Sequence, residues 1–243
     1  MNNASSTALF PPQVTLATAG ALAFDLDVMG VARRYNRSIA RQIIAAVGAC
    51  TEPLIDFGAG TGNIAAEVFA ECGTTPSCIE PDQHFQGVLR SKGFPVHELH
   101  DLPDGQAEGL YSCNVLEHIE HDAAALAVAM QKLRTGASVF IYVPAFPILF
   151  GLWDEQVGHH RRYTRRSLHD TMRQAGVQVT RTGYADSLGF MATGAMKLVR
   201  RGVQVTERKV QFYDRHIFPW SQRLDRVAHP LFGKNVWAIG VKP

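Results

Sequence analysis

The sequence contains few cysteines, and their positions form neither a metal-binding nor a disulfide pattern. Four occur among 243 residues, all in the first half and none in Cys-x-x-Cys spacing. The missing spacing argues against a zinc site, and the low count argues against a disulfide framework. We therefore expect Cys50, Cys72, Cys78 and Cys113 to be reduced thiols, mostly buried in the core.

Long apolar runs and a targeting signal are also missing. No run approaches the roughly 18 apolar residues that cross a bilayer, so no membrane span is predicted. Residues 1–24 contain no Lys or Arg before their apolar part, and Pro11, Pro12 and Gly20 interrupt them, which makes a poor signal peptide. These observations predict a cytoplasmic protein.

The charge is unevenly distributed along the chain. The formal net charge is only +2. However, residues 1–150 hold eight Lys and Arg against fifteen Asp and Glu, whereas residues 151–243 hold sixteen against seven. The first part is therefore at −7 and the second at +9, and we expect the two parts to face different ligands. A 46% hydrophobic content is enough for a sizeable core and argues against disorder.

Short β-rich runs alternate with helical stretches after residue 50. This alternation predicts an α/β fold in which helices cover both faces of a mostly parallel, Rossmann-like sheet of seven strands. The expected strands are 53–57, 76–80, 95–99, 109–113, 137–143, 177–183 and 235–241. The expected helices are 36–47, 62–72, 81–92 with Pro81 in the first helical position, 121–134 ended by Gly136, and 164–175.

One segment departs from the alternation. Residues 187–233 precede the last strand and contain two expected helices, 189–200 and 211–228, rich in large apolar side chains. We interpret this insertion as a cap over the acceptor or as an oligomer interface, for example in a homodimer. We expect Phe190, Tyr213 or Trp220 to reach the acceptor cavity or a partner subunit. The remaining chain divides into an N-terminal helical cap at 1–50 and a Rossmann-like domain formed by 51–186 and 234–243.

A glycine-rich turn carries the strongest functional signal. An apolar strand runs into Asp56-Phe-Gly58-Ala-Gly60-Thr-Gly62-Asn63, and such a turn lets a nucleotide-like ligand lie against bare backbone. Glu80 lies 22 residues after Gly58, which matches an acid that binds ribose hydroxyls. Asp56 suits a ligand with an ammonium group better than a pyrophosphate. Together with Asn63 in place of a glycine, it disfavours an NAD(P)-dependent oxidoreductase.

These motifs resemble those of the class I S-adenosylmethionine-dependent methyltransferases. The resemblance rests on Tyr35-Asn-Arg37, Asp56–Asn63, Ile79-Glu-Pro-Asp82 and Asn114-Val-Leu-Glu-His-Ile119. It implies S-adenosylmethionine as cofactor and the strand order 3-2-1-4-5-7-6 with an antiparallel last strand. It also departs at one position, because Gly109 stands where family members usually carry an Asp at the start of the fourth strand.

The resemblance also implies roles for individual residues in cofactor binding. Gly58, Gly60 and Gly62 would cradle the methionine part, with Asp56 near its amino group. Glu80 would bind both ribose hydroxyls and Asp101 would face the adenine amino group. The remaining two cofactor residues, near the methyl-bearing sulfur, would be Tyr35 and Asn114.

A second cluster follows the fifth strand. Residues 154–163 resemble the Asp-x-x-x-Gly-His-x-Arg-Arg-Tyr segment of a bacterial methyltransferase subgroup associated with small-molecule or cell-surface glycan biosynthesis. Arginines there could clamp a carboxylate, phosphate or sugar-nucleotide group. The expected acceptor-binding residues are Trp153, Arg161, Arg162 and Tyr163. By contrast, Arg165 and Arg166 are interpreted as the exposed first turn of a helix capped by Thr164.

Removal of a proton from a hydroxyl acceptor requires a base or a metal ion. The candidate bases are His118, His159 and Asp154. Asn114, Glu117 and His118 are also similar to the cation-binding positions of quinone-biosynthesis O-methyltransferases, but Asn114 replaces an acid there. We therefore expect no required metal.

The sequence thus predicts a methyltransferase that acts on a hydroxyl or amine of a small, anionic or glycosylated biosynthetic intermediate. Two alternatives remain at this stage: a cofactor-binding partner protein that has lost catalysis, and the NAD(P)-dependent oxidoreductase. A nucleic-acid substrate is not expected, because the chain has no Asn/Asp-Pro-Pro-Tyr/Phe motif and no Pro-Cys pair.

Overall fold

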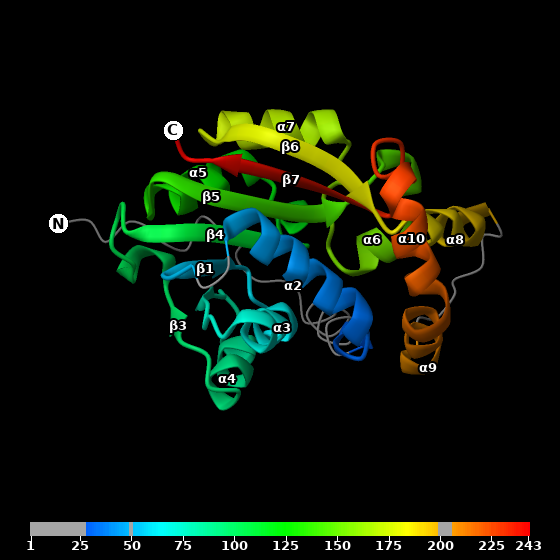
Figure 1. The fold of residues 1–243 in the computed structure, drawn as a ribbon, viewed down its shortest axis with the longest axis horizontal. Helices are drawn as coiled ribbons and strands as arrows, with labels where there is room; N and C mark the ends of the chain where they lie inside the picture. The colour runs from blue at the N-terminus through cyan, green and yellow to red at the C-terminus, as the bar shows by residue number, and fades with distance from the viewer. Residues whose placement is uncertain (1–27, 49–50, 199–205) are drawn as a thin grey trace.

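A seven-stranded sheet forms the centre of the molecule in the computed structural model, which describes residues 28–48, 51–198 and 206–243 (Figure 1). Its order is β3-β2-β1-β4-β5-β7-β6, and β7 is antiparallel to both of its neighbours. The expected fold class and strand order are confirmed. The predictions that residues 1–24 are not a signal peptide and that Cys50 is a reduced thiol concern positions outside the described residues. The strands are β1 (Leu54–Phe57), β2 (Ser77–Ile79), β3 (Val96–His97), β4 (Ala107–Cys113), β5 (Leu133–Pro144), β6 (Gln178–Ala185) and β7 (Asn235–Val241).

Helices cover both faces of the sheet. On one face lie α2 (Arg33–Val47) and α3 (Asn63–Cys72), and α2 crosses in front of the strands in Figure 1. The α2 side chains Tyr35, Ile39 and Ile43 recur every four residues and are all buried, as expected for one face of a helix. They pack against apolar side chains of β1, β4 and β5.

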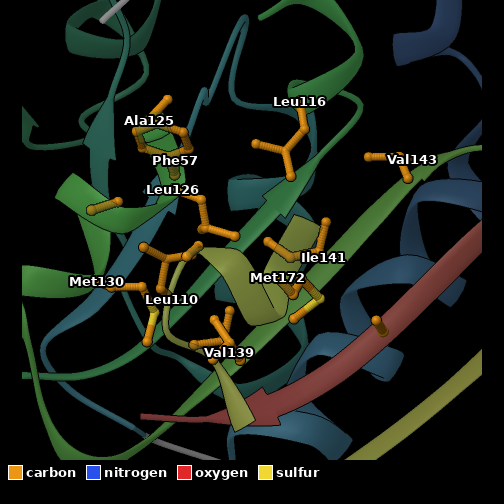
Figure 2. Packing of buried hydrophobic residues seen from close by; sticks show 14 of the residues in the cluster. Phe57, Leu110, Leu116, Ala125, Leu126, Met130, Val139, Ile141, Val143 and Met172 are labelled. Carbon is orange, nitrogen blue, oxygen red and sulfur yellow. The ribbon is translucent and has the colours of Figure 1, made fainter. Parts of the chain in front are cut away.

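The opposite face carries α5 (Asp122–Gln131) and α7 (Arg165–Gln174). Leu126 and Met130 from α5 meet Met172 from α7 over Leu110 and Val139 of the central strands (Figure 2). The middle of β5 is buried on both sides, which is why its sequence reads as a continuous apolar run instead of an alternation.

Several helix boundaries differ from the expectation: α2 begins three residues early, at Arg33, and two other differences have a clear structural reason. The helix expected at 121–134 ends at Gln131, because Leu133 is fully buried and already pairs with Ala107 as the start of β5. The helix expected from Pro81 is α4 (Gln83–Ser91), whose cap is Asp82: its carboxylate accepts the backbone N–H groups of His84 and Phe85. The short helices are η1 (Leu99–Asp101), η2 (Leu116–His118), η3 (Pro147–Leu149) and α6 (Leu152–Gln156).

The insertion is helical, as expected. It contains α8 (Ser187–Leu198) and a continuous run formed by α9 (Glu207–Phe212), the π-helical turn η4 (Tyr213–Ile217) and α10 (Phe218–Ala228). Asp186 and Asp225 join these helices where they meet. Asp186 accepts hydrogen bonds from the Tyr213 and Ser221 hydroxyls, and Asp225 accepts the backbone N–H groups of Asp186 and Ser187.

A third acid joins the insertion to the sheet-covering helix α2. Asp214 of η4 is buried, and its carboxylate accepts the backbone N–H groups of Arg34 (3.1 Å) and Tyr35 (2.8 Å) at the beginning of α2. Those groups have no carbonyl partner within the helix, so an acid placed 180 residues later in the chain satisfies them. These hydrogen bonds join the insertion to the helix that covers the sheet.

We expect Asp214→Ala to destabilise the protein by roughly 1–3 kcal/mol, because two helix-terminal N–H groups would lose their acceptor. Urea unfolding followed by circular dichroism measures this difference. The control is Asp170→Ala on the exposed side of α7, which should change stability by less than about 0.5 kcal/mol. Equal stability of the two variants would show that the carboxylate does not hold α2.

Candidate active site at the carboxyl edge of the sheet

The turn after β1 has no room for a side chain at Gly58 or Gly62. Gly58, Gly60 and Gly62 have φ values of 84°, 54° and 76°, in the left-handed region. A Cβ atom on Gly58 would lie 2.4 Å from Cγ2 of Val115, and one on Gly62 would lie 2.7 Å from Cδ2 of Leu89. Gly58 and Gly62 are therefore required both by conformation and by space, and Gly60 is favoured by its conformation.

Glu80 ties this turn to the second strand. Its carboxylate is 7% exposed, and it accepts the N–H of Gly60 at 2.7 Å on one oxygen and the N–H of Asp82 at 3.0 Å on the other. Burial raises the pKa of Glu80 to about 7, although both hydrogen bonds act in the opposite direction. A carboxylate has about four lone-pair positions, so each oxygen can still accept a ligand hydroxyl.

Asp56 is an incompletely satisfied acid at this edge. It is 3% exposed in β1, and its Oδ2 atom has no hydrogen-bond partner among the described residues. Burial raises its pKa to about 7; Tyr111 opposes this shift and the charge of Glu80 adds to it. A buried carboxylate oxygen without a partner is costly, and a cationic ligand group would relieve that cost.

Two further predicted residues meet through a side chain that the sequence analysis missed. Asn114 follows β4 with a left-handed φ of 55°, and its Oδ1 accepts the Nδ2 amide of Asn235 at 3.3 Å. Asn235 in turn accepts the Tyr35 hydroxyl at 3.1 Å. Tyr35 and Asn114 therefore lie on either side of Asn235. Nothing in the sequence marked Asn235, because its role comes from the antiparallel pairing of β7.

Asp101 lies apart from these groups. It is in η1, beyond β3, with its side chain 61% exposed and 3.3 Å from His100. The proposed contact with adenine stays a prediction. The departure at Gly109 is smaller than expected, because β4 begins two residues earlier, at Ala107, and carries the acid Glu108, which pairs with Arg134.

The segment after β5 brings the candidate bases together. Nδ1 of His159 lies 2.7 Å from Oδ1 of Asp154, and Nε2 of His159 lies 3.9 Å from Oε1 of Glu117. The His118 and His159 rings are 4.6 Å apart, edge to face. Asp154 is buried, and the hydrogen bonds from His159 and Arg162 lower its pKa despite its burial. All three predicted catalytic residues thus belong to one cluster.

Glu117, His118 and His159 could also hold a metal ion. One ligand atom from each lies within 4.8 Å of the others, and both oxygens of the fully buried Glu117 lack a hydrogen-bond partner among the described residues. One carboxylate and two imidazoles form a donor set that suits a divalent cation. The sequence analysis compared only the first two of these residues with a cation site and expected no required metal, and that expectation stays a prediction.

The expected acceptor-binding residues have different surroundings. Arg162 is buried, and its Nε donates to Asp154 at 2.7 Å; Tyr163 is 1% exposed, and its hydroxyl donates to Asp122 at 2.7 Å. These two side chains are engaged inside the protein. Arg161 and Trp153 are half-buried, and Arg161 contacts the Glu120 carbonyl and the Asp122 carboxylate.

Comparison with known proteins gives consistent matches. Residues 31–182 match the family described as methyltransferase domain, and no curated protein matches. A chain from the complex of the Haloferax volcanii Trm112 methyltransferase activator with a methyltransferase has 15% identity and a TM-score of 0.64, with 96% of this chain and 100% of that chain covered.

Two other solved structures are S-adenosylmethionine-dependent methyltransferases. One, from Archaeoglobus fulgidus, has 17% identity and a TM-score of 0.58, with 86% and 94% coverage of the two chains. The other, from Thermotoga maritima, has 12% identity and a TM-score of 0.60, with 94% and 100% coverage. At these identities the structural likeness shows the shared fold. Within the described residues, no helix has the length and apolar character needed to cross a membrane.

The unpaired carboxylate of Asp56 predicts a pH-dependent effect of Asp56→Asn. Its pKa in the folded protein is raised to about 7, so the unfolded chain ionises first and the wild type loses stability as pH rises from about 4 to about 7, after which the loss levels off. Without ligand, the variant should therefore gain about 1.4 kcal/mol relative to the wild type between pH 6 and pH 8.

Thermal unfolding at the two pH values measures this gain as a Tm difference. Asp170→Asn, at an exposed position, serves as the control. A difference between variant and wild type that is the same at both pH values would contradict the burial of an ionising carboxylate at Asp56.

Proposed function

The chain belongs to the methyltransferase domain family, and we propose that it transfers a methyl group from S-adenosylmethionine to a hydroxyl or amine of a small, anionic or glycosylated biosynthetic intermediate. The observation that carries the cofactor assignment is the glycine turn tied to Glu80 beside the unpaired carboxylate of Asp56. The S-adenosylmethionine-dependent enzymes of similar structure support it.

The residues of the carboxyl edge fit this cofactor. Gly58, Gly60 and Gly62 offer backbone that carries no side chain at these three positions. Asp56 offers a carboxylate to an amino group, and Glu80 offers free lone pairs to ribose hydroxyls. Tyr35, Asp101 and Asn114 complete the proposed set. When bound, S-adenosylmethionine supplies a methyl group on a positively charged sulfur, which departs as a neutral thioether.

We propose that His159 is the base that accepts the acceptor's proton. A proton on Nδ1 of His159 satisfies Asp154, which leaves the Nε2 lone pair free to accept a proton. Asp154 acts as a positioning residue, since it fixes the ring and stabilises the imidazolium that forms. His118 is less suited, because burial and the nearby His159 lower its pKa to about 3.

The acceptor would lie on the basic side of the site. Arg161 and Trp153 are the side chains proposed to contact it, while Arg162 and Tyr163 would keep the segment in place through Asp154 and Asp122. The positive charge of residues 151–243 favours an anionic group on the acceptor. The likeness of residues 154–163 to a subgroup linked to small-molecule or glycan biosynthesis supports this class of acceptor.

The proposed division of the chain follows from the same assignment. Residues 51–186 and 234–243 would bind the cofactor, residues 1–50 would form a helical cap, and residues 187–233 would close the acceptor side or join a second copy. The hydrogen bonds of Asp214 to the backbone of α2 support a link between the insertion and the N-terminal helix.

Thermal shift with ligand tests the cofactor assignment. S-adenosylhomocysteine at 100 times its Kd should stabilise the wild type by about 2.7 kcal/mol, or roughly 5–10 °C for a chain of this size. Glu80→Gln should lose most of that shift. An amide has one acceptor oxygen where a carboxylate has two, so it cannot accept hydrogen bonds from two ribose hydroxyls and two backbone N–H groups at once. Glu67→Gln in α3, whose carboxylate pairs with Arg37 away from the glycine turn, should retain it. Stabilisation by NADH but not by S-adenosylhomocysteine would overturn the proposal.

Transfer of labelled methyl groups tests the catalytic assignment. The probes are sugar phosphates, nucleotide sugars and small hydroxy acids, with uncharged sugars for comparison. On the acceptor that turns over, His159→Gln should lower kcat by at least about 100-fold, and Asp154→Asn should lower kcat while the KM for S-adenosylmethionine stays unchanged. His160→Gln, an exposed neighbour, is the matched control.

Two results of that assay would contradict the assignment. Loss of turnover in His118→Gln but not in His159→Gln would move the base to the other histidine. Treatment with EDTA should leave turnover unchanged; loss of turnover that Mg²⁺ or Mn²⁺ restores would show that Glu117, His118 and His159 bind a required cation instead.

A further inference from the structure

Exposed apolar side chains are concentrated in one part of the molecule. Among the described residues, nine large apolar side chains are exposed, and all except Phe69 lie between residues 148 and 231. Single exposed apolar residues are common on protein surfaces, whereas a concentration of them marks an interaction site. The eight are Ile148, Leu152, Met191, Met196, Phe212, Trp220, Val227 and Leu231.

Three of them lie along α9, η4 and α10, and Leu231 follows shortly after α10. Phe212, Trp220 and Val227 are 60%, 61% and 71% exposed. The Phe212 ring lies 5.0 Å from that of His216, and the Arg223 guanidinium lies 4.5 Å above the Trp220 ring. Phe212 and His216, four residues apart, therefore lie on one side of α9 and η4. Trp220, Arg223 and Val227 follow one another at intervals of three and four residues, so they lie on one side of α10. The apolar stripe of this surface consists of Phe212, Trp220 and Val227. We call this the α9–α10 face.

The charges on the α9–α10 face have one sign. Arg208, Arg215, Arg223 and Arg226 are exposed. The acids of the same helical run point elsewhere: Asp214 accepts hydrogen bonds from the α2 backbone, and Asp225 accepts them from Asp186 and Ser187. Glu207, in the first turn of α9, is the one exposed acid between residues 206 and 231. Basic groups therefore flank the apolar stripe without acids between them.

A basic hollow lies at the end of this face. Leu231, 70% exposed, lines an open hollow of 510 Å³ together with Arg165, Arg166 and His169. The Arg165 guanidinium is held there by the Thr182 hydroxyl and the Pro230 carbonyl. An anionic group could therefore lie in the hollow while the neighbouring apolar stripe contacts hydrocarbon.

We propose that the α9–α10 face docks onto the surface of an anionic lipid bilayer. Apolar and Trp side chains enter the boundary between head groups and acyl chains, and Arg side chains around them bind lipid phosphates. Figure 1 shows α9 and α10 at the end of the molecule away from β3 and α4, where such a surface can approach them.

Other occupants fit these observations less well. A symmetric pair of chains joined through this face would bring two basic patches together, and like charges across an interface are unfavourable. A nucleic acid would pair with the arginines but would leave Val227 and Leu231 without an apolar partner.

Flotation of the full-length chain with lipid vesicles tests the proposal. Vesicles of phosphatidylcholine with about one-third phosphatidylglycerol should bind the protein, and vesicles of phosphatidylcholine alone should bind it at least about tenfold more weakly. Binding should weaken at high salt. The variant Arg223→Glu/Arg226→Glu should lose at least about tenfold in partitioning, and Arg173→Glu on α7 should not.

A second pair of variants tests the apolar stripe. Trp220→Ser/Val227→Ser should reduce binding, whereas Phe69→Ser, an equally exposed apolar position elsewhere, should not. Vesicles should shift the tryptophan fluorescence of the wild type to shorter wavelength, and Trp220→Phe should remove that shift. Each variant must keep the wild-type Tm and its response to S-adenosylhomocysteine.

Three outcomes would overturn the proposal. These are absence of binding to anionic vesicles, equal loss of binding in the surface and control variants, and a dimer in solution that Trp220→Ser/Val227→Ser abolishes. The last would show that the face binds a second copy. Vesicle binding is measured without an acceptor or turnover, so its failure is distinct from failure of the methyltransferase assignment.

Discussion

The site depends on a turn that has room for backbone only. Val115, from the loop after β4, packs against Gly58, and Leu89, from α4, packs against Gly62. Two separate elements therefore contact the turn formed by residues 58–62. The Glu80 carboxylate then holds the middle of the turn through the Gly60 N–H. The end of β1, the end of β2 and the loop after β4 are thereby fixed relative to one another. Apart from Asp101 in η1, every group proposed to bind the cofactor lies on one of these segments or is joined to them through Asn235.

This rigidity allows acids to remain unpaired. Burial raises the pKa values of Asp56, Glu80 and Glu117 to about 7, and oxygens of Asp56 and Glu117 lack partners among the described residues. Such groups reduce the stability of the fold, and unsatisfied polar groups of this kind are found where a ligand is to be bound. The acids of the insertion differ: Asp186, Asp214 and Asp225 all receive hydrogen bonds and hold helices together.

The two oppositely charged parts of the chain therefore have different roles in our interpretation. The acidic part contains carboxylates that face a cofactor with an amino group and hydroxyls. The basic part contains the segment that carries His159 and Arg161, and its remaining arginines are largely on the outer surface of the insertion and of α7. The small net charge of +2 is the sum of these two unequal halves.

The sequence alone determined the α/β class, the seven strands and the glycine turn, because strand runs, helix-ending glycines and the Gly58–Gly62 spacing are local patterns. It also placed His118, His159 and Asp154 among the candidates. It misjudged where α4 begins and where α5 ends, since the Asp82 cap and the pairing of Leu133 with Ala107 outweigh local helix signals.

Only the tertiary structure decided how distant residues pair. In the tertiary structure Asp154 forms hydrogen bonds with both His159 and Arg162, Asn235 lies between Tyr35 and Asn114, and Asp214 binds the backbone at the start of α2. The tertiary structure also turned Arg162 and Tyr163 inward while leaving Trp220 exposed. Apart from those of Asp154, which are local, these contacts join residues far apart in the chain. Their partners are determined by the position of β7 between β5 and β6 and by the packing of the insertion, which no local pattern encodes.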